Sequence, residues 1–346
     1  MNRMIGKNPE IFFPPEWAKQ EFVQLTFPHA ATDWADMLDE VQDCFCEIIS
    51  NILQFENVLA VCADDESVNK VEKLNKNSNH KLLIANCQSN DTWARDHAAI
   101  TVFFNGKRTL LDFSFNGWGL KFAANYDNLI TSKLFSEKIF TNFNYKDYRN
   151  FILEGGSIET DGAGTILTTE KCLLSQNRNY LSKSEIEKYL KKYFGIKRIL
   201  WLQNGFLTGD DTDSHIDTLA RFCNETTIAY VKCEDMQDVH YKELTAMEKA
   251  LQNFRTFDKK PYNLIALPMA DKVVFNGKIL PATYANFLII NSAVLLPTYN
   301  SPKDKTAAEI LQKVFPNRKI VPINCLPLIK QGGSLHCATM QFPKNI

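Results

Sequence analysis

The sequence predicts a mixed α/β protein in which five similar units close into a single ring around a central channel. One order of elements recurs: a hydrophobic strand, often paired as a hairpin, then an amphipathic helix, then a second strand. No linker rich in proline or glycine separates the units, and EGGSI at 154–158 returns as QGGSL at 331–335. Units that cannot bury their apolar faces alone must stack on one another, so we expect one domain over residues 1–346.

Each unit is identified by its own strands and helix. In the first, the strands EFVQLTFPH and NVLAVCA flank a helical pattern over 34–53. The second contains a hairpin over 96–115, whose Asn105-Gly106 pair is a strong turn signal. Three more units follow the same order, over 156–202, 215–268 and 286–324. We expect the final strand, which contains QGGSLHCATMQ, to pair beside the first unit and close the ring.

Composition excludes several classes of function. The 346 residues are 45% hydrophobic with a net charge of -1, which supports a large core but leaves no basic excess for nucleic acid. No apolar run approaches the roughly 18 residues of a transmembrane helix. The N-terminal MNRMIGKNPEIFFPPEW lacks the apolar region of a signal peptide. We therefore expect a cytoplasmic protein without nucleic-acid or membrane partners.

The nine cysteines do not form a disulfide or zinc pattern. Their number is odd, no C-x-x-C occurs, and most lie in apolar runs such as NVLAVC. We expect eight of them to be packing residues. The exception is Cys337, which follows a double glycine and His336 near the C-terminus.

Four polar stretches interrupt the strand pattern, and a ring would bring them together at its axis. They are 90–100, 151–165, 209–222 and 331–341. Alternation along a strand predicts that His215 and Asp217 share a face, whereas His336 and Cys337 point to opposite sides. If Cys337 reaches a site as a nucleophile, we therefore expect His215, not His336, to be its imidazole partner.

These stretches also allow simpler interpretations. Asp211-x-Asp213-x-His215 resembles the start of a calcium loop but lacks the required glycine and distal glutamate. His215, Asp217 and Cys337 suit zinc by ligand type, yet no second cluster has short ligand spacing. Arg95 beside Asp96 suggests a structural ion pair, and each tryptophan taken singly suggests core packing.

A thiol surrounded by carboxylates indicates a cationic substrate. Unneutralised carboxylates raise the pKa of a thiol and disfavour the reactive thiolate. A guanidinium would neutralise them, because its planar fork of N–H donors matches carboxylates.

The chain resembles the agmatine deiminase family, which is related to bacterial peptidylarginine deiminases, arginine deiminases and amidinotransferases. The resemblance extends from PPEW and TFPH near the start to the final cysteine. Its motifs are DTWARD, LEGGSIETDG, NRN at 177–179, DDTDSHIDTLARF, ATYANFLIINSAVLLPTYN and GGSLHCATMQ. It implies a five-bladed α/β propeller (pentein) and hydrolysis of agmatine to N-carbamoylputrescine and ammonia, a step of polyamine biosynthesis or arginine catabolism.

The resemblance also implies roles for individual residues. Cys337 matches the nucleophile, His215 the general acid and base, and Glu154 the partner of the catalytic histidine. Asp96 and Asp217 match the carboxylates that hold the guanidinium, and Trp93 and Trp118 fall at aromatic positions near the substrate. The resemblance implies no metal and no organic cofactor. The expected partner is a small guanidine substrate, and a homo-oligomer is compatible with the resemblance.

Two departures from the family pattern concern fine substrate preference. His97-Ala98-Ala99 follows Asp96 where many relatives have a residue and then Gly-Pro, and Ser214 replaces a glycine before His215. Three alternatives remain: deimination of peptidyl-arginine, amidino transfer, and a non-catalytic guanidine-binding protein.

Overall fold

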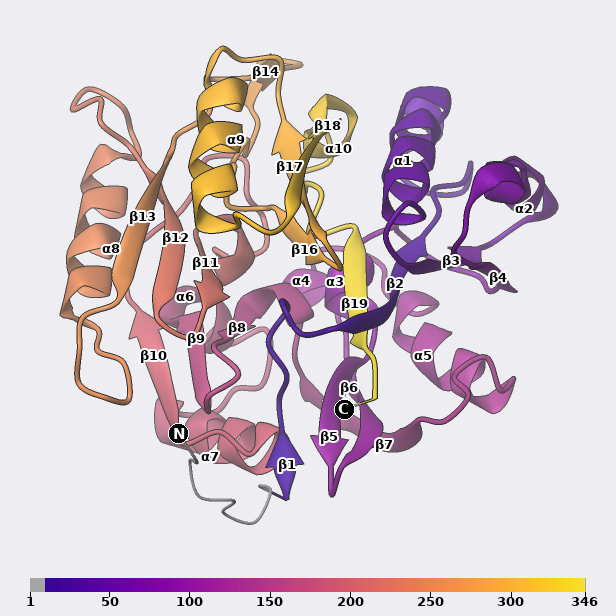
Figure 1. The fold of residues 1–346 in the computed structure, drawn as a ribbon, viewed down its shortest axis with the longest axis horizontal. Helices are drawn as coiled ribbons and strands as arrows, with labels where there is room; N and C mark the ends of the chain where they lie inside the picture. The colour runs from indigo at the N-terminus through magenta and orange to yellow at the C-terminus, as the bar shows by residue number, and fades with distance from the viewer. Residues whose placement is uncertain (1–9, 346) are drawn as a thin grey trace.

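The computed structural model describes residues 10–345 as a mixed α/β fold (Figure 1). Within these residues lie five sheets of three or four strands and one two-stranded sheet, β14 (Val274–Phe275) with β15 (Lys278–Ile279). Each larger sheet contains an antiparallel strand pair followed by a parallel pair. All five predicted strand, helix and strand units are therefore present.

The first two units carry extra strands. Unit one consists of β2 (Gln20–Thr26), α1 (Leu38–Ile52), β3 (Asn57–Cys62), α2 (Asp65–Glu72), β4 (Leu82–Asn86) and the C-terminal β19 (Thr339–Pro343). Unit two consists of β1 (Ile11–Phe12), β5 (Ile100–Phe104), β6 (Lys107–Ser114), α5 (Asp127–Ser136) and β7 (Asn144–Ile152).

The other three units are shorter versions of the same order. Unit three consists of β8 (Ile158–Thr160), β9 (Thr165–Thr169), α6 (Glu170–Leu173), α7 (Lys183–Phe194) and β10 (Arg198–Leu202). Unit four consists of β11 (Ala220–Asn224), β12 (Thr227–Lys232), α8 (Tyr241–Asn253) and β13 (Asn263–Pro268). Unit five consists of β16 (Leu288–Ile290), β17 (Ala293–Thr298), α9 (Lys303–Val314) and β18 (Lys319–Asn324).

The pairing of the last strand with the first unit is confirmed. β19 runs antiparallel to β2, with Thr339 opposite Leu25 and Phe342 opposite Phe22. The two strands lie side by side near the centre of Figure 1 although they come from opposite ends of the chain. This pairing fixes the segment that carries Cys337, which directly precedes β19.

Local sequence signals explain where several elements begin and end. The Asn105-Gly106 turn has positive φ at both residues, 48° and 76°, as a two-residue hairpin of type I′ requires. α7 begins with a capping box between Ser182 and Glu185 and ends at Gly195 in the left-handed conformation.

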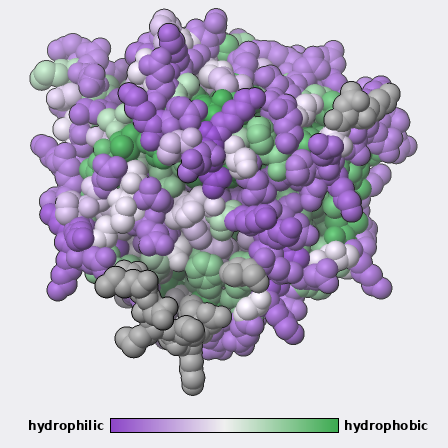
Figure 2. All heavy atoms as spheres, in the orientation of Figure 1, coloured by the Kyte–Doolittle hydropathy of each residue, from purple (hydrophilic) through white to green (hydrophobic). Residues whose placement is uncertain are grey.

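Long helices lie at the periphery, and the short α3 (Ala94–His97) and α4 (Gly117–Leu120) lie near the centre (Figure 1). α1 buries Val41, Phe45, Ile48 and Ile52, which recur at helical spacing. Hydrophilic residues dominate the face shown in Figure 2, with hydrophobic ones recessed between them. Among the residues that the structure describes, no helix has the length and apolar character needed to cross a bilayer.

Candidate active site

The candidate site is assembled from the short segment that precedes the first strand of each antiparallel pair. These segments are α3 before β5, the 3-10 turns Gly155–Ser157 before β8 and Ile216–Thr218 before β11, the loop before β16, and the turn 335–338 before β19. Every unit thus contributes one segment to the same place. The four predicted polar stretches do converge, and the loop before β16 adds a fifth.

Asn286 is the site residue that sequence reasoning missed. Its side-chain Nδ2 lies 3.3 Å from Cys337 Sγ, and its Oδ1 accepts a 2.8 Å hydrogen bond from the backbone N–H of His336. It stands before the first strand of unit five, at the position that the other units use for their polar residues. Asn286 could have been predicted from this position, because it is equivalent to the positions of the polar site residues in the other units.

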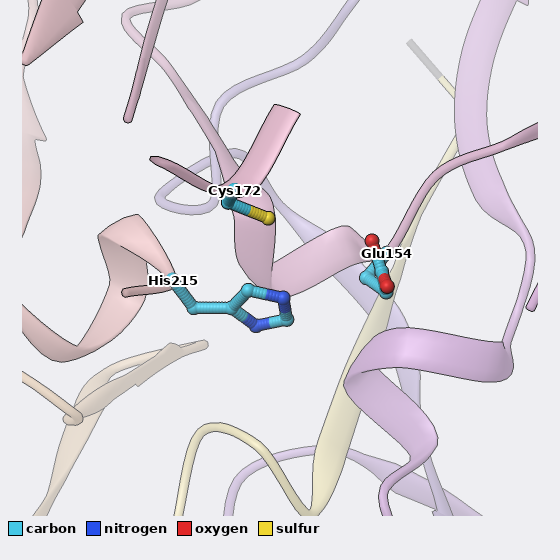
Figure 3. Close-up of side chains that lie close together, drawn as sticks. All are labelled: Glu154, Cys172 and His215. Atoms are coloured by element: carbon cyan, nitrogen blue, oxygen red, sulfur yellow. The ribbon is translucent and has the colours of Figure 1, made fainter. Parts of the chain in front are cut away.

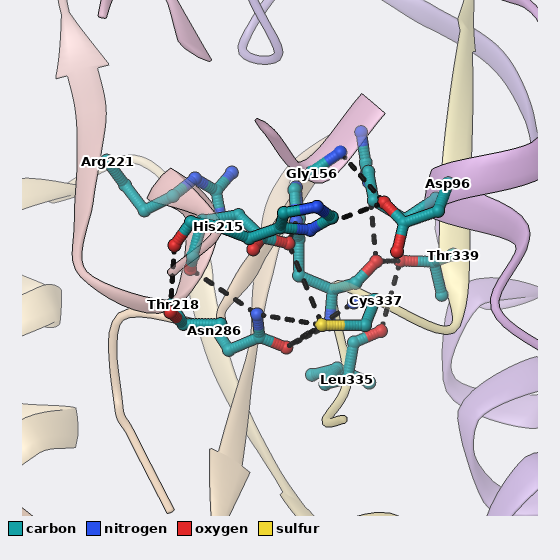
Figure 4. Close-up of polar contacts among 12 residues, drawn as sticks. Asp96, Gly156, His215, Thr218, Arg221, Asn286, Leu335, Cys337 and Thr339 are labelled. Carbon is teal, nitrogen blue, oxygen red and sulfur yellow. Dashed lines mark hydrogen bonds and ion pairs between the residues drawn. The ribbon is translucent and has the colours of Figure 1, made fainter. Parts of the chain in front are cut away.

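Cys337 is buried among polar groups and retains its proton in the free protein. Its Sγ lies 3.7 Å from Asp217 Oδ2, and the residue is 4% exposed. Burial, and then the charges of Asp217 and Asp96, raise the pKa of the Cys337 thiol well above its ordinary value. Figure 4 shows Cys337 and Asn286 in contact, with His215 and Asp96 beside them. The thiol therefore needs a cation nearby before it can ionise readily.

The imidazole of His215 lies beside the charge of Asp96, and its ring nitrogens make no hydrogen bond to the described residues. Its Nδ1 lies 3.6 Å from Asp96 Oδ1, and neither ring nitrogen has a hydrogen-bond partner among the described residues. Burial lowers the pKa of His215, but Asp96, then the nearby Cys172 sulfur and then Glu154 raise it well above the ordinary value and prevail. Both ring nitrogens are therefore free to exchange protons with a substrate.

The two site carboxylates differ in their surroundings. Asp96 accepts hydrogen bonds from Gly156 N (3.0 Å) and Trp118 Nε1 (2.9 Å), and burial raises its pKa to about 6. Burial also acts on Asp217, but the hydrogen bond and charge of His336 outweigh it and hold the pKa of Asp217 below its ordinary value. Asp217 Oδ1 has no partner among the described residues.

Gly156 leaves the space that these groups surround. A Cβ at this position would lie 2.7 Å from His215 Nδ1, 2.9 Å from Asp96 Oδ1 and 3.1 Å from Asp217 Oδ2. Figure 4 shows Gly156 beside His215 and Asp96. The double glycine of LEGGS is thus not simply a turn, because its second member lets these three polar groups lie close to its backbone.

Glu154 is placed beside His215 by an arginine. Both carboxylate oxygens accept from Arg178 Nε, at 2.9 and 3.0 Å, and Arg178 also contacts Asp213 at 2.7 Å. Arg178 is the arginine of the NRN motif, and it had no predicted role. Its guanidinium is the counterion of a fully buried carboxylate close to the imidazole.

One of the eight cysteines expected to be packing residues lies at the site. The ligand atoms of Cys172, Glu154 and His215 lie within 4.8 Å of one another (Figure 3). Sulfur, oxygen and nitrogen donors suit zinc by type. The cluster nevertheless does not fit a zinc ion, because Arg178 already occupies both oxygens of Glu154.

Three further expectations need correction. The segments that carry His215, Asp217 and Cys337 are 3-10 helix or turn, so strand alternation does not apply to them. His336 consequently does not face away, and it contacts Asp217 at 2.7 Å. Arg95 pairs with Glu16 (3.7 Å) and not with Asp96.

The acidic loop does not resemble a calcium site in its contacts. Asp213 pairs with Lys121 at 2.8 Å and with Arg178 at 2.7 Å. Asp210 accepts hydrogen bonds from the backbone N–H groups of Thr212 and Ser214. The carboxylates of Asp210 and Asp213 therefore already pair with backbone N–H groups or with cationic side chains, and a calcium ion would have to displace these partners.

The predicted aromatic residues occupy different places. Trp118 touches the site through its hydrogen bond to Asp96. Trp93 donates to Asp91 at 3.1 Å, and its ring packs so closely on Gly333 that a Cβ there would lie 2.3 Å from it. His97 is buried beside Thr26, and burial lowers its pKa to about 3, so it brings no charge to the site.

Comparison with known proteins gives a consistent set of relatives. The family described as Porphyromonas-type peptidyl-arginine deiminase matches residues 12–343. A putative agmatine deiminase of Legionella pneumophila is 33% identical, over 96% of this chain and 95% of the relative.

Two solved structures are similar along nearly their whole length. The putative arginine deiminase of Porphyromonas gingivalis is 49% identical, with a TM-score of 0.91 over 97% of this chain and 99% of that one. A substrate-bound Cys-to-Ser variant of C. jejuni agmatine deiminase is 38% identical, with a TM-score of 0.91 over 100% of both chains.

Proposed function

Because the chain belongs to the Porphyromonas-type peptidyl-arginine deiminase family, we propose that it is an agmatine deiminase, which hydrolyses agmatine to N-carbamoylputrescine and ammonia. The observation that carries this proposal is the cluster beside Gly156, in which Cys337, His215 and two carboxylates lie close together. A thiol nucleophile, a proton-carrying imidazole and a receptor for a cation are thus combined at one point.

The carboxylates bind the guanidinium. Asp96 Oδ1 and Asp217 Oδ2 both lie beside Gly156, and Asp217 Oδ1 has no partner among the described residues, so the two carboxylates can accept from different N–H groups of one planar cation. The bound charge offsets both carboxylates and lowers the pKa of the Cys337 thiol. Trp118 fixes the orientation of Asp96 through its indole N–H.

The reaction proceeds in two halves on the same sulfur. The ionised Cys337 attacks the central guanidinium carbon, and His215 protonates the departing ammonia, which leaves a covalent S-alkylthiouronium. His215 then takes a proton from water as the water adds to this carbon, and the C–S bond breaks to release the urea product. Glu154 supports the cationic form of His215 through its charge.

Several wider statements belong to the same proposal. Five sheets of equal strand pattern, with β19 beside β2, support a five-bladed α/β propeller of the pentein type that forms one domain over residues 1–346. The substrate is a small cationic guanidine, with no nucleic-acid or membrane partner, and the protein acts in the cytoplasm. A homo-oligomer is compatible with these assignments.

The test is turnover by the purified protein without added metal. Agmatine, free arginine and an arginyl peptide are offered separately, and ammonia and product mass are measured. We expect agmatine to gain about one mass unit as C=NH becomes C=O, with a chelator causing no loss and Cys337→Ala abolishing turnover. Preference for the peptide would favour a peptidylarginine deiminase, amidino transfer to an added amine a transferase, and binding without turnover a non-catalytic protein.

A further inference from the structure

His336 makes two contacts that the proposed reaction does not explain. Its Nδ1 lies 2.7 Å from Asp217 Oδ2, and its Nε2 lies 2.7 Å from Glu16 Oε2. The side chain is 2% exposed. An ionised carboxylate only accepts hydrogen bonds, so each contact with a carboxylate anion requires a proton on the imidazole nitrogen.

Glu16 is an anion, because cations and a backbone N–H surround it. Its Oε1 lies 2.9 Å from Arg221 Nη2 and accepts from Ile289 N at 2.8 Å, and its Oε2 lies 3.7 Å from Arg95 Nη2. Burial raises the pKa of Glu16, but Arg221 and His336 outweigh it and hold the pKa well below the usual range. The proton between Glu16 and His336 therefore belongs to the imidazole.

The balance of charge leads to the same protonation state. Around His336 the structure buries three carboxylates, Glu16, Glu159 and Asp217, and two guanidinium groups, Arg95 and Arg221. Burial raises the pKa of Glu159, but Arg221 pairs with it; with all three carboxylates ionised, a neutral His336 would leave one of them without a counterion, which is strongly unfavourable. A doubly protonated His336 completes three anion–cation pairs. Glu16, Glu159 and His336 form a second group of possible metal ligands. Arg95, Arg221 and the imidazolium already neutralise its carboxylates.

We infer that His336 is a positioning residue, which as a buried imidazolium between Glu16 and Asp217 keeps Asp217 ionised and holds its carboxylate beside Gly156 and Cys337. This inference rests on the proposed guanidine hydrolysis for the role of that carboxylate. The contact takes up Asp217 Oδ2 and leaves Oδ1 without a partner among the described residues. Glu16, far away in the sequence within PPEW, fixes the other end of the imidazole.

The consequence appears in the pH dependence of substrate binding. The titratable or charged groups that act on Asp217 are His336, His215 and Arg221 as cations, with Asp96 and the Cys337 thiol opposing. Those that act on His336 are Asp217, Glu16 and Glu159 as anions, with Arg95 and Arg221 beyond them. Without the imidazolium, the burial of Asp217 is no longer offset and its pKa rises. A protonated Asp217 cannot accept fully from a guanidinium.

The variant that tests this is His336→Gln, which retains one N–H donor and removes the charge. We expect KM for agmatine to rise roughly tenfold or more near neutral pH. The acid limb of kcat/KM, which Asp96 sets in the wild type with a pKa of about 6, should move up by about one pH unit or more, because the pKa of Asp217 without its imidazolium then exceeds that of Asp96. His240→Gln is the matched control, since His240 is also buried against a carboxylate, Asp238 at 2.6 Å, but in a different loop. It should leave the limb in place.

A merely structural role would give a different result. It predicts a uniform loss of kcat/KM at every pH, with the acid limb unmoved, and a folded His336→Gln with that profile would overturn the inference. If the variant does not fold, neutron diffraction from the deuterated wild type decides the matter. Deuterium on both ring nitrogens of His336 is expected, and deuterium on only one would overturn it.

The two proposals fail in distinguishable ways. A wild-type protein that turns over no guanidine would remove the proposed function, and the neutron map would still decide the protonation of His336. A wild-type agmatine deiminase whose His336 is singly protonated would remove the inference alone.

Discussion

His215 Nδ1 lies 3.6 Å from Asp96 Oδ1, while the other oxygen of Asp96 is held by Trp118 Nε1 at 2.9 Å. The carboxylate thus lies between the proton carrier and a fixed indole, at the place where a guanidinium would bind. In the proposed mechanism, the ionisation of Asp96 controls both the binding of the guanidinium and the charge on His215.

The first prediction concerns the acid limb of activity. The pKa of Asp96 is raised to about 6, chiefly by burial. Asp96 must be ionised to bind the cation, so kcat/KM for agmatine should fall about tenfold per pH unit once the pH drops below that value. Steady-state kinetics across the acidic and neutral range measures it. An unchanged kcat/KM well below pH 6 would contradict the assignment.

A pair of tryptophan variants tests whether Asp96 sets the acid limb of kcat/KM. The hydrogen bond from Trp118 lowers the pKa of Asp96, so Trp118→Phe should move the acid limb to higher pH while retaining an aromatic ring. Trp93→Phe removes an indole N–H that goes to Asp91 instead, and the limb should stay in place.

The second prediction concerns the space beside Gly156. Gly156→Ala places a Cβ within 3.1 Å of three polar side chains of the site. We expect a loss of at least about 100-fold in kcat/KM, because a misplacement near 1 Å is costly when geometry supplies the rate. The circular dichroism spectrum should be unchanged. Gly277→Ala is the control for a strained backbone away from the site, since its φ is 75° and its Cβ would meet nothing within 4 Å, and it should keep full activity.

The third prediction concerns how Cys337 becomes reactive. In the free protein, burial and then Asp217 and Asp96 raise the pKa of the thiol. A cationic amidine electrophile binds between the carboxylates and lowers it, whereas a neutral amide of the same shape does not. Chloroacetamidine should therefore alkylate Cys337 at least about ten times faster than chloroacetamide. Equal rates, followed by intact mass, would show that a bound cation does not activate the thiol.

The fourth prediction concerns stability beside the site. Ser214 has φ of 65°, a conformation that glycine adopts more easily, and its buried hydroxyl has no partner among the described residues. After allowing for the greater chain entropy of glycine in the unfolded state, Ser214→Gly should raise the free energy of unfolding by roughly 1 kcal/mol. Denaturant titration measures the change.

Ser292 offers the matched comparison. It has φ of 60° but is exposed, so Ser292→Gly relieves the backbone without removing a buried hydroxyl. A smaller gain is expected there. A loss of stability in Ser214→Gly would mean that the serine makes a compensating contact.

Much of this arrangement was predictable because the repeats are regular. Period-2 and period-3.6 patterns predicted the strands and helices, and the order of elements predicted the neighbour of β19. Strand alternation failed at His336, because a turn between Leu335 and Ala338 has no two-residue period. Contacts between distant segments, such as Arg178 with Glu154 or Glu16 with His336, leave no local pattern to detect.

Cys172 illustrates the same limit. Its apolar surroundings predicted a packing residue, and the thiol is indeed fully buried. Only the folded chain brings it beside His215, since the two belong to different units.

The most direct measurement is the intact mass of the protein quenched during turnover of agmatine. The account predicts a transient adduct on Cys337, heavier than the free protein by the mass of agmatine minus one ammonia, in the wild type but not in Cys337→Ala. Turnover without any such adduct, or an adduct located on another residue, would contradict it.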